Sequence, residues 1–329
     1  MKRSSAFKVV RMVVSAGIIL YLVMKLDLGE IGMHLKSLKP VPLLLAAAAD
    51  FLMICANSWR WDVLLKAKGI VLPLPRLIYY YLVGIFWSAF LPTSVGGDFA
   101  RIVGVASATG RRADTFASVV VERLMGFFVL IPICLIAIPF VAGSIEDIRP
   151  LLVIGVAGLL VFLAAYLALL RPVARRISRL LDPLFSLLGK FRVREKLEKA
   201  YEAIVTYRGS RGAVVSGFAL SVVSRLLWVL GCYFVARAFS LDVSFTTLLV
   251  VVPVVELARA VPISLSGIGV REAAFVALLG QFGVEGNIAF AYGLVVYFVF
   301  FIFSIIGGVL YAAGGLGKAA GAASGETAE

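Results

Sequence analysis

Charged residues are scarce in this sequence of 329 residues. Asp, Glu, Lys and Arg make up 16% of the chain, whereas hydrophobic residues make up 61%. Because soluble domains carry about a quarter charged residues, this composition excludes an ordinary soluble globular fold. Several apolar runs reach the roughly 20 residues that span a bilayer. The sequence therefore predicts an all-α, polytopic helical membrane protein with no large soluble domain.

Cysteine and histidine are also rare. Cys55, Cys134 and Cys232 lie far apart in apolar runs, and the single His34 has no ligand-like neighbours. This spacing predicts neither a disulfide framework nor a zinc site, and we expect no metal or cofactor. The chain also lacks a Ser–His or Cys–His pair and a P-loop, so its motifs do not predict an enzyme or ATP coupling.

Acidic residues are outnumbered, with 19 Asp and Glu against 32 Lys and Arg. Eleven of the basic residues lie between Arg171 and Arg211. Four more precede or open the first apolar run: Lys2, Arg3, Lys8 and Arg11. Basic loops beside spans mark the cytoplasmic side and attract anionic lipid head groups. We therefore expect membrane lipids, and not nucleic acid, as partners of a multi-pass protein in the cell (inner) membrane, with cytoplasmic N- and C-termini.

The apolar runs predict eight helical segments in a membrane-embedded domain over residues 1–317. Residues 171–212, between two of these segments, predict a basic, amphipathic segment on the cytoplasmic surface. Residues 318–329 are small and polar and predict a disordered tail. The eight segments lie at 9–26, 41–65, 75–91, 114–142, 150–170, 213–239, 244–262 and 286–313.

Eight full crossings would conflict with the positive charges. If 75–91 crossed completely, the basic segment 171–212 would lie outside. The conflict disappears if residues 75–112 form a re-entrant hairpin that enters from the cytoplasm, breaks at Pro92–Gly97 and returns. Proline ends a helix and glycine allows a tight turn.

A second break resembles the first. "PTSVGGDFAR" and "PISLSGIGVR" match at Pro92/Pro262, Ser94/Ser264, Gly97/Gly267 and Arg101/Arg271. Since the second copy would enter from the opposite face, the pair is typical of an inverted repeat whose broken helices build a site near the membrane centre. The alternative is two ordinary loops, because Pro, Ser and Gly are common loop residues.

Ionisable residues inside spans are costly and usually functional. Asp50 is one of them. Arg60, between two tryptophans, is interpreted as an interfacial residue. Glu256 and Arg259 lie three apart and are predicted to pair. The excess of arginine suits phosphate. The predicted substrate-binding residues are Pro92, Ser94, Gly97, Asp98, Arg101, Glu122, Arg123, Arg225, Glu256, Arg259, Pro262, Ser264, Gly267, Arg271 and Glu272.

Two stretches carry a family resemblance: "FLPTSVGGDFARIVGVASATGRRADTFASVVVERLMG" and "PISLSGIGVREAAFVALLGQFGVEGNIAFAYGLVVYFVF". Their blocks P-T-S-x-G-G-D-x-x-R, V-x-x-E-R-x-x-G and P-x-S-x-x-G-x-G-x-R-E resemble those of the lysylphosphatidylglycerol synthase transmembrane family. Ser266 departs from the glycine found in many members. The resemblance implies a flippase-like domain. Fused members make aminoacylated phosphatidylglycerol and move it, whereas stand-alone relatives are linked to other lipids, including polyprenyl-linked sugars. Because this chain ends soon after its last apolar segment, we expect no aminoacyltransferase domain.

The leading hypothesis is a flippase or scramblase that moves a phosphate-containing lipid head group between leaflets. The lipid would be a phospholipid, an aminoacylated phospholipid or a polyprenyl-linked lipid. The alternative is an ion-coupled secondary transporter of a small anionic solute, in which a carboxylate such as Glu256 carries protons. A membrane-embedded lipid enzyme is a third reading. Small residues in "GGVLYAAGG" would also permit the close helix packing of a homo-oligomer.

Overall fold

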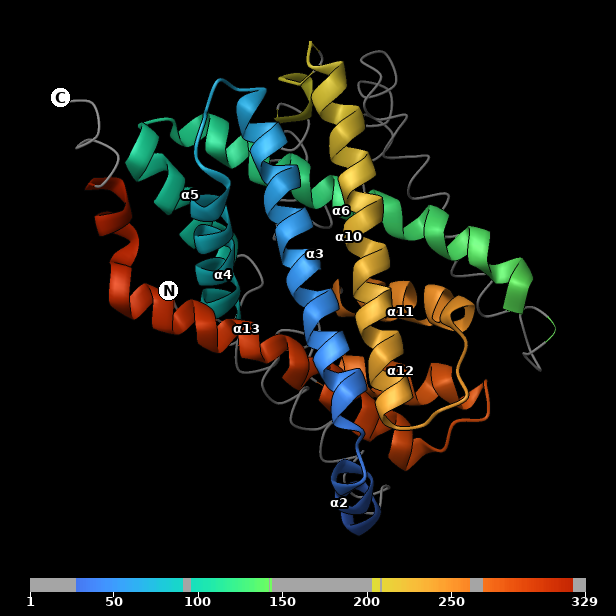
Figure 1. The fold of residues 1–329 in the computed structure, drawn as a ribbon. Helices are drawn as coiled ribbons and strands as arrows, with labels where there is room; N and C mark the ends of the chain where they lie inside the picture. The colour runs from blue at the N-terminus through green and yellow to red at the C-terminus, as the bar shows by residue number, and fades with distance from the viewer. Residues whose placement is uncertain are drawn as a thin grey trace, which may run out of the picture.

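The computed structural model describes residues 28–90, 96–141, 143, 203–207, 209–260 and 269–321, and these parts of the chain are almost entirely helical (Figure 1). Their helices are α2 (Leu28–Lys36), α3 (Pro40–Lys66), α4 (Leu74–Phe90), α5 (Gly96–Thr109), α6 (Arg112–Val141), α10 (Arg211–Ala238), α11 (Phe245–Ala260), α12 (Val270–Gly280) and α13 (Gly286–Gly321).

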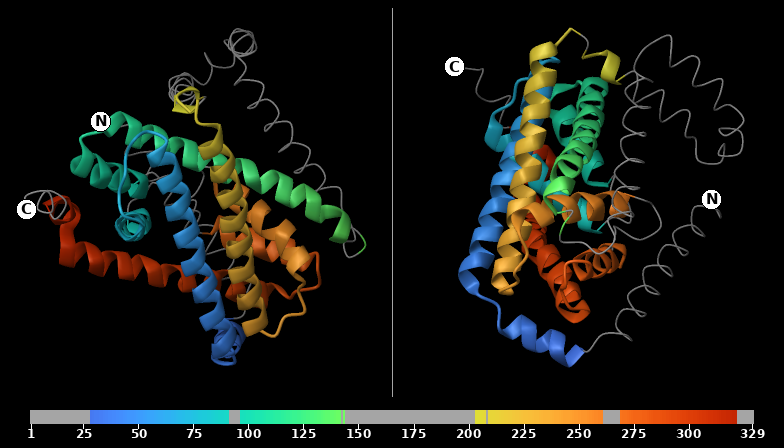
Figure 2. Two further views of the ribbon diagram at one scale, coloured as in Figure 1. Left: turned by 45° about the horizontal axis from the view of Figure 1, so that its top comes forward. Right: turned by 90° about the vertical axis from the view of Figure 1, so that its right-hand side faces the viewer.

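Helices α3 and α10 form an antiparallel pair (Figure 1), which lies along one side of the described helices in the right-hand view of Figure 2. At one end, the backbone N–H of Lys39 donates a hydrogen bond to the carbonyl of Ala238 at 3.1 Å. Towards the other end, Gly217 of α10 lies against Leu64 of α3. The two helices therefore remain in contact along nearly their whole length, and the other long helices cross them obliquely.

The described helices fall into two halves with the same order of lengths. Helices α3, α4, α5 and α6 have 27, 17, 14 and 30 residues, and α10, α11, α12 and α13 have 28, 16, 11 and 36. Helix α13 packs against α4, and its counterpart α6 packs against α11. The two halves therefore repeat the same order of long and short helices and make corresponding contacts.

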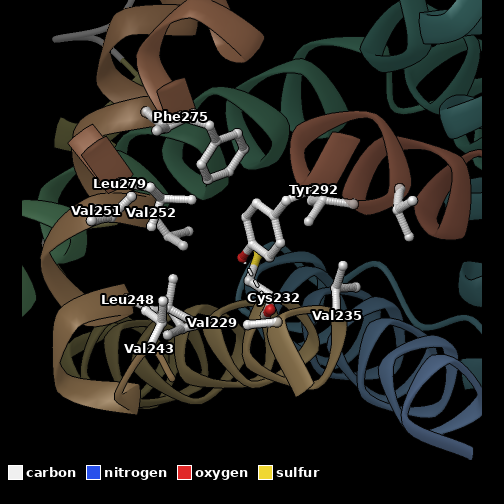
Figure 3. Close-up of a cluster of buried hydrophobic side chains, with 14 of the residues drawn as sticks. Val229, Cys232, Val235, Val243, Leu248, Val251, Val252, Phe275, Leu279 and Tyr292 are labelled. Atoms are coloured by element: carbon white, nitrogen blue, oxygen red, sulfur yellow. Dashed lines mark hydrogen bonds between the residues drawn. The ribbon is translucent and has the colours of Figure 1, made fainter. Parts of the chain in front are cut away.

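Within each half, the two short helices pack against each other as a hairpin. In the second half, Val251 of α11 and Leu279 of α12 share one apolar core with Val229 of α10. Figure 3 shows Tyr292 of α13 pointing across this core toward Cys232. The Tyr292 hydroxyl donates a hydrogen bond to the Cys232 carbonyl at 3.0 Å, which joins α13 to α10.

Several glycines are required by close helix contacts. A Cβ added to Gly97, near the start of α5, would overlap the carbonyl oxygen of Gly84 in α4, and one on Gly307 would overlap the carbonyl of Leu82. Gly97 is not among the glycines with positive φ, whereas Gly269, directly before α12, has φ 85°. The sequence prediction that Gly97 serves a tight turn is therefore wrong: its role is to let α5 approach α4 closely.

Six of the eight expected apolar segments coincide with described helices, and 9–26 and 150–170 lie outside the described residues. Most of 171–212 and all of 322–329 lie outside them as well. Within the described part of the chain, four helices are long and apolar enough to cross a membrane: α3, α6, α10 and Gly286–Gly314 of α13. Helices α4 and α11 are shorter, at 17 and 16 residues.

The close contact between Gly307 and the α4 backbone predicts that adding a methyl group at this glycine lowers stability, whereas adding one at an open glycine does not. Gly307→Ala should destabilise the protein by about 1–3 kcal/mol, because overpacking forces the α13 and α4 backbones apart. Gly212→Ala is the matched control, since no atom lies within 4 Å of an added Cβ there. Thermal unfolding in detergent measures both. Equal melting temperatures for the two variants would contradict the close α4–α13 packing.

Candidate functional site

Glu122 of α6 is the centre of a buried charge cluster in the first half. Its side chain is almost inaccessible, and its two carboxylate oxygens are shared among three helices. Arg60 of α3 donates to Oε1 and Arg101 of α5 donates to Oε2, each at 2.9 Å. The hydroxyl of Tyr81, on α4, donates to Oε1 at 3.2 Å. A carboxylate held by two guanidinium groups satisfies the rule that buried charges are paired.

Arg101 is enclosed on every side. Its Nη2 donates to Asp98 at 2.8 Å, while Nη1 binds Glu122. The guanidinium carbon lies 4.4 Å from the ring centroid of Tyr81 and 4.9 Å from that of Trp61, which places it between two aromatic faces. Cation–π contacts strengthen when they are desolvated. Gly84 leaves room for this side chain, since an added Cβ would lie 2.8 Å from Arg101 Cγ.

Two further contacts extend the first cluster. Arg123, one residue after Glu122, forms an ion pair with the second carboxylate oxygen of Asp98, and its side chain remains 37% exposed. Arg60 also donates to the hydroxyl of Ser221 on α10 at 2.9 Å. The cluster thus reaches the partner half of the fold through α10 and approaches the surface through Arg123.

A second cluster lies in the other half, at α11 and α12. Arg259 pairs with Glu256 at 2.6 Å, as the three-residue spacing predicts. Arg271 pairs with its neighbour Glu272, and its guanidinium carbon lies 4.4 Å from the ring centroid of Tyr297 on α13. Glu272 also accepts a hydrogen bond from the backbone N–H of Gly269 at 2.8 Å, which caps the start of α12.

Arg225, in the middle of α10, lies between the two clusters. Its Nε donates to the carbonyl of Gly126 on α6 at 3.3 Å. Gly126 has no side chain to block it, since an added Cβ would lie 3.1 Å from Arg225 Nη2. Arg225 lies within electrostatic range of Glu256, which attracts it, and of Arg60 and Arg259, which repel it. The two clusters and Arg225 are therefore one electrostatic network.

The network carries more positive than negative groups. Six arginines face four carboxylates, an excess of two positive charges at neutral pH. The Nε atoms of Arg60, Arg259 and Arg271 are buried, and the described residues offer them no hydrogen-bond partner. Guanidinium donors left without a carboxylate favour an anion, and their fork geometry matches phosphate.

Ten of the fifteen predicted site residues fall in the described residues. Nine of these ten are charged and belong to the network, and Gly97 supports it by admitting α5 next to α4. The other five lie outside the described residues: Pro92, Ser94, Pro262, Ser264 and Gly267.

The interpretation of Arg60 as an interfacial residue is wrong. Its side chain is 4% exposed and binds Glu122 and Ser221. Tyr81 and Ser221 were not predicted either. The partners of Arg60 are 62 and 161 residues away in the sequence and therefore leave no local pattern.

The model of the family described as the lysylphosphatidylglycerol synthase TM region matches residues 8–308. The chain belongs to this family. The match spans both halves and every charged residue of the network.

Two archaeal relatives are similar along most of their length. A "UPF0104 membrane protein" of Methanothermobacter thermautotrophicus is 22% identical over 281 residues, which are 80% of this chain and 82% of the relative. The "UPF0104 membrane protein MJ1595" of Methanocaldococcus jannaschii is 22% identical over 309 residues, which are 91% and 92% of the two chains. Both relatives are named as membrane proteins, and only the description of the family refers to a lipid.

The central position of Glu122 predicts a large stability effect. Glu122→Gln should destabilise the protein by about 3–5 kcal/mol, because it leaves Arg60 and Arg101 buried without a shared counter-charge. Asp114→Asn, on the same helix, is the control: its pair with Arg111 is exposed and should contribute about 0–1 kcal/mol. Thermal unfolding in detergent compares them. A Glu122→Gln protein as stable as Asp114→Asn would contradict the bridging role.

Proposed function

We propose that the protein is a lipid flippase or scramblase that moves a phosphate-containing head group between the leaflets. The observation that carries this proposal is the buried and partly buried network of six arginines and four carboxylates, which joins both halves of a membrane domain. A phosphate diester entering the network would reduce its positive excess and meet unpartnered guanidinium donors. The acyl chains would remain in the surrounding lipid.

The architecture supports transport across the membrane. We propose that α4/α5 and α11/α12 are re-entrant hairpins of an inverted repeat. Helices of 17 and 16 residues are about 25 Å long, which is less than the roughly 30 Å of the hydrocarbon core. Broken helices of this kind form binding sites at the interface between repeats. Two contacts of the network cross between the halves, from Arg60 to Ser221 and from Arg225 to the carbonyl of Gly126.

The excess of positive charge in the network limits which lipid head groups would bind favourably. Two uncompensated positive charges favour a net anionic group, such as a phosphodiester with an acidic substituent or a diphosphate. A head group with an added amine would bring further positive charge, and Asp98, Glu122 and Glu272 are already engaged by arginines. On this basis we propose an anionic phospholipid or a polyprenyl-linked phosphate as the cargo.

The distribution of positive charges along the sequence is the basis for the proposed orientation in the membrane. We propose a multi-pass protein of the cell membrane with the basic segment 171–212 in the cytoplasm, since cytoplasmic loops carry an excess of Lys and Arg. We propose no catalytic role, so a separate enzyme would supply the lipid.

An ion-coupled transporter of a small anionic solute is the second candidate. The same unpartnered guanidinium donors would bind a free phosphate or carboxylate as well as a lipid phosphate. Uptake of a water-soluble anion into proteoliposomes, without any lipid movement, would favour this candidate.

Arg271 provides the direct test of phosphate binding. Arg271→Gln should lower the rate of head-group translocation about tenfold or more, since hydrogen bonds to charged groups contribute about 1.5–3 kcal/mol. The assay follows a head-group-labelled fluorescent phospholipid in proteoliposomes, quenched from outside with dithionite. Arg237→Gln is the control, because Arg237 is an exposed arginine of α10 that contacts Tyr233.

Arg101 and Arg271, which occupy matching positions in the two similar sequence stretches, should differ in their effect on protein stability. Arg271 has only local carboxylate contacts, whereas Arg101 joins α5 to α6. Arg101→Gln should therefore lower both the melting temperature and the translocation rate, while Arg271→Gln lowers mainly the rate. Wild-type translocation by a folded Arg271→Gln protein would overturn the phosphate assignment.

Cysteine accessibility tests the hairpins. In a background without native cysteines, Ser94→Cys and Ser264→Cys should react slowly with a membrane-impermeant maleimide, because the hairpin tips would lie within the membrane. Lys66→Cys and Asp242→Cys are fast-reacting controls at opposite ends of the α3–α10 pair, where both residues are exposed. Rapid labelling of both tips from one face would show two ordinary loops.

A further inference from the structure

Asp50 is a buried carboxyl group that the arginine network does not use. It lies on α3, and its side chain is 3% exposed. Its Oδ1 is buried, and the described residues give it no hydrogen-bond partner. Ten residues separate it from Arg60, a distance of about 15 Å along the helix. Asp50 is thus an ionisable group inside a long apolar helix that is separate from the arginine network.

Asp50 is far from both ends of the part of α3 that would span the membrane. It is the eleventh residue of α3, about 15 Å from the first. The hydrocarbon core is about 30 Å thick. Asp50 therefore lies near the middle of the span, where ionisable residues are rare and usually functional.

The groups around Asp50 offer it no counter-ion. On α10 it faces Gly231, where an added Cβ would lie 2.6 Å from Oδ1, and the next residue is Cys232. From α13, Tyr292 approaches this region through its hydrogen bond to the Cys232 carbonyl (Figure 3). From α11, the charge of Glu256 acts on the same cysteine. All of these groups are neutral or acidic, and no Lys, Arg or His of the described residues pairs with Asp50.

The surroundings of Glu122 differ from those of Asp50, because Glu122 is paired with cations. It receives two arginines and a tyrosine hydroxyl. Asp50 receives none, and its carboxyl packs directly against Gly231, which has no side chain to offer a donor. Because an isolated carboxylate is strongly disfavoured in apolar surroundings, this environment fits a neutral acid that ionises only when water reaches it.

We propose that Asp50 is a proton-binding site at the α3–α10 contact, and that it binds and releases a proton during each transport cycle. The second part rests on the proposed transport function. Helices α3 and α10 belong to different halves of the fold, so a movement of one half against the other changes the surroundings of Asp50 and would let water reach it. A proton gradient would then drive the cycle.

Carbodiimide labelling tests proton binding without any transport assay. Dicyclohexylcarbodiimide reacts with protonated carboxyl groups in apolar surroundings, and peptide mass spectrometry locates the adduct. In the purified full-length protein, Asp50 should be labelled at low pH and progressively less as the pH rises. Glu122, held by Arg60 and Arg101, is the internal control and should remain unlabelled. Failure to label Asp50 at any pH overturns the proton site.

Transport under an imposed pH gradient tests the coupling. In proteoliposomes with the head-group-labelled phospholipid, the wild-type rate should differ between inward and outward proton gradients. Asp50→Asn should fold, as judged by its melting temperature, and lose this difference. Asp62→Asn is the matched control on the same helix, since Asp62 is paired with Lys66 at 2.7 Å, and it should keep the response.

The outcomes separate this inference from the proposed function. Lipid movement that ignores the gradient in both wild type and Asp50→Asn overturns the coupling and leaves the flippase in place. Absence of lipid movement in the wild type at every pH overturns the flippase, and the labelling result then decides alone whether Asp50 binds a proton. A gradient response that survives in Asp50→Asn also overturns the coupling.

Discussion

The shared carboxylate of Glu122 is the interaction on which the first half of the fold depends. Apolar helices in a membrane gain little from hydrophobic association, so polar contacts and close packing must define their arrangement. Glu122 receives Arg60 from α3, Arg101 from α5 and Tyr81 from α4. One side chain of α6 thereby fixes three neighbouring helices, and the glycines at 84 and 97 allow the approach that these contacts need.

The two halves differ in how they hold their charges, although their helices correspond. In the first half three ion pairs of the network cross between helices, and Arg101–Asp98 joins residues three positions apart on α5. In the second half each pair joins residues one or three positions apart, as in Arg259–Glu256 and Arg271–Glu272. A local pair survives when helices separate, whereas a crossing pair must break. The helices of the second half are therefore held together by their shared apolar core and by the hydrogen bond from Tyr292 to Cys232 rather than by ion pairs.

The sequence predicted the helices better than the contacts between them. Apolar runs placed six described helices within about two residues at their starts, because an apolar stretch of a given length has few alternatives in a membrane. The Glu256–Arg259 pair was predictable because its partners share one helix turn. Arg60 was misread because flanking tryptophans are typical of an interface, and its partner Glu122 is 62 residues away. No local pattern encodes such a distance.

The contrast between Asp50 and the arginine network shows two ways in which one membrane domain tolerates buried charge. Glu122 keeps its charge because guanidinium groups surround it, and such a site can exchange one anion for another without changing its protonation. Asp50 has no cation and avoids its charge by holding a proton. A network with surplus positive charge can bind an anion, and a neutral acid about 15 Å away on the same helix can respond to a proton gradient. Since α3 carries both Arg60 and Asp50, one movement of this helix against α10 would alter both sites together, which is the physical requirement for coupling.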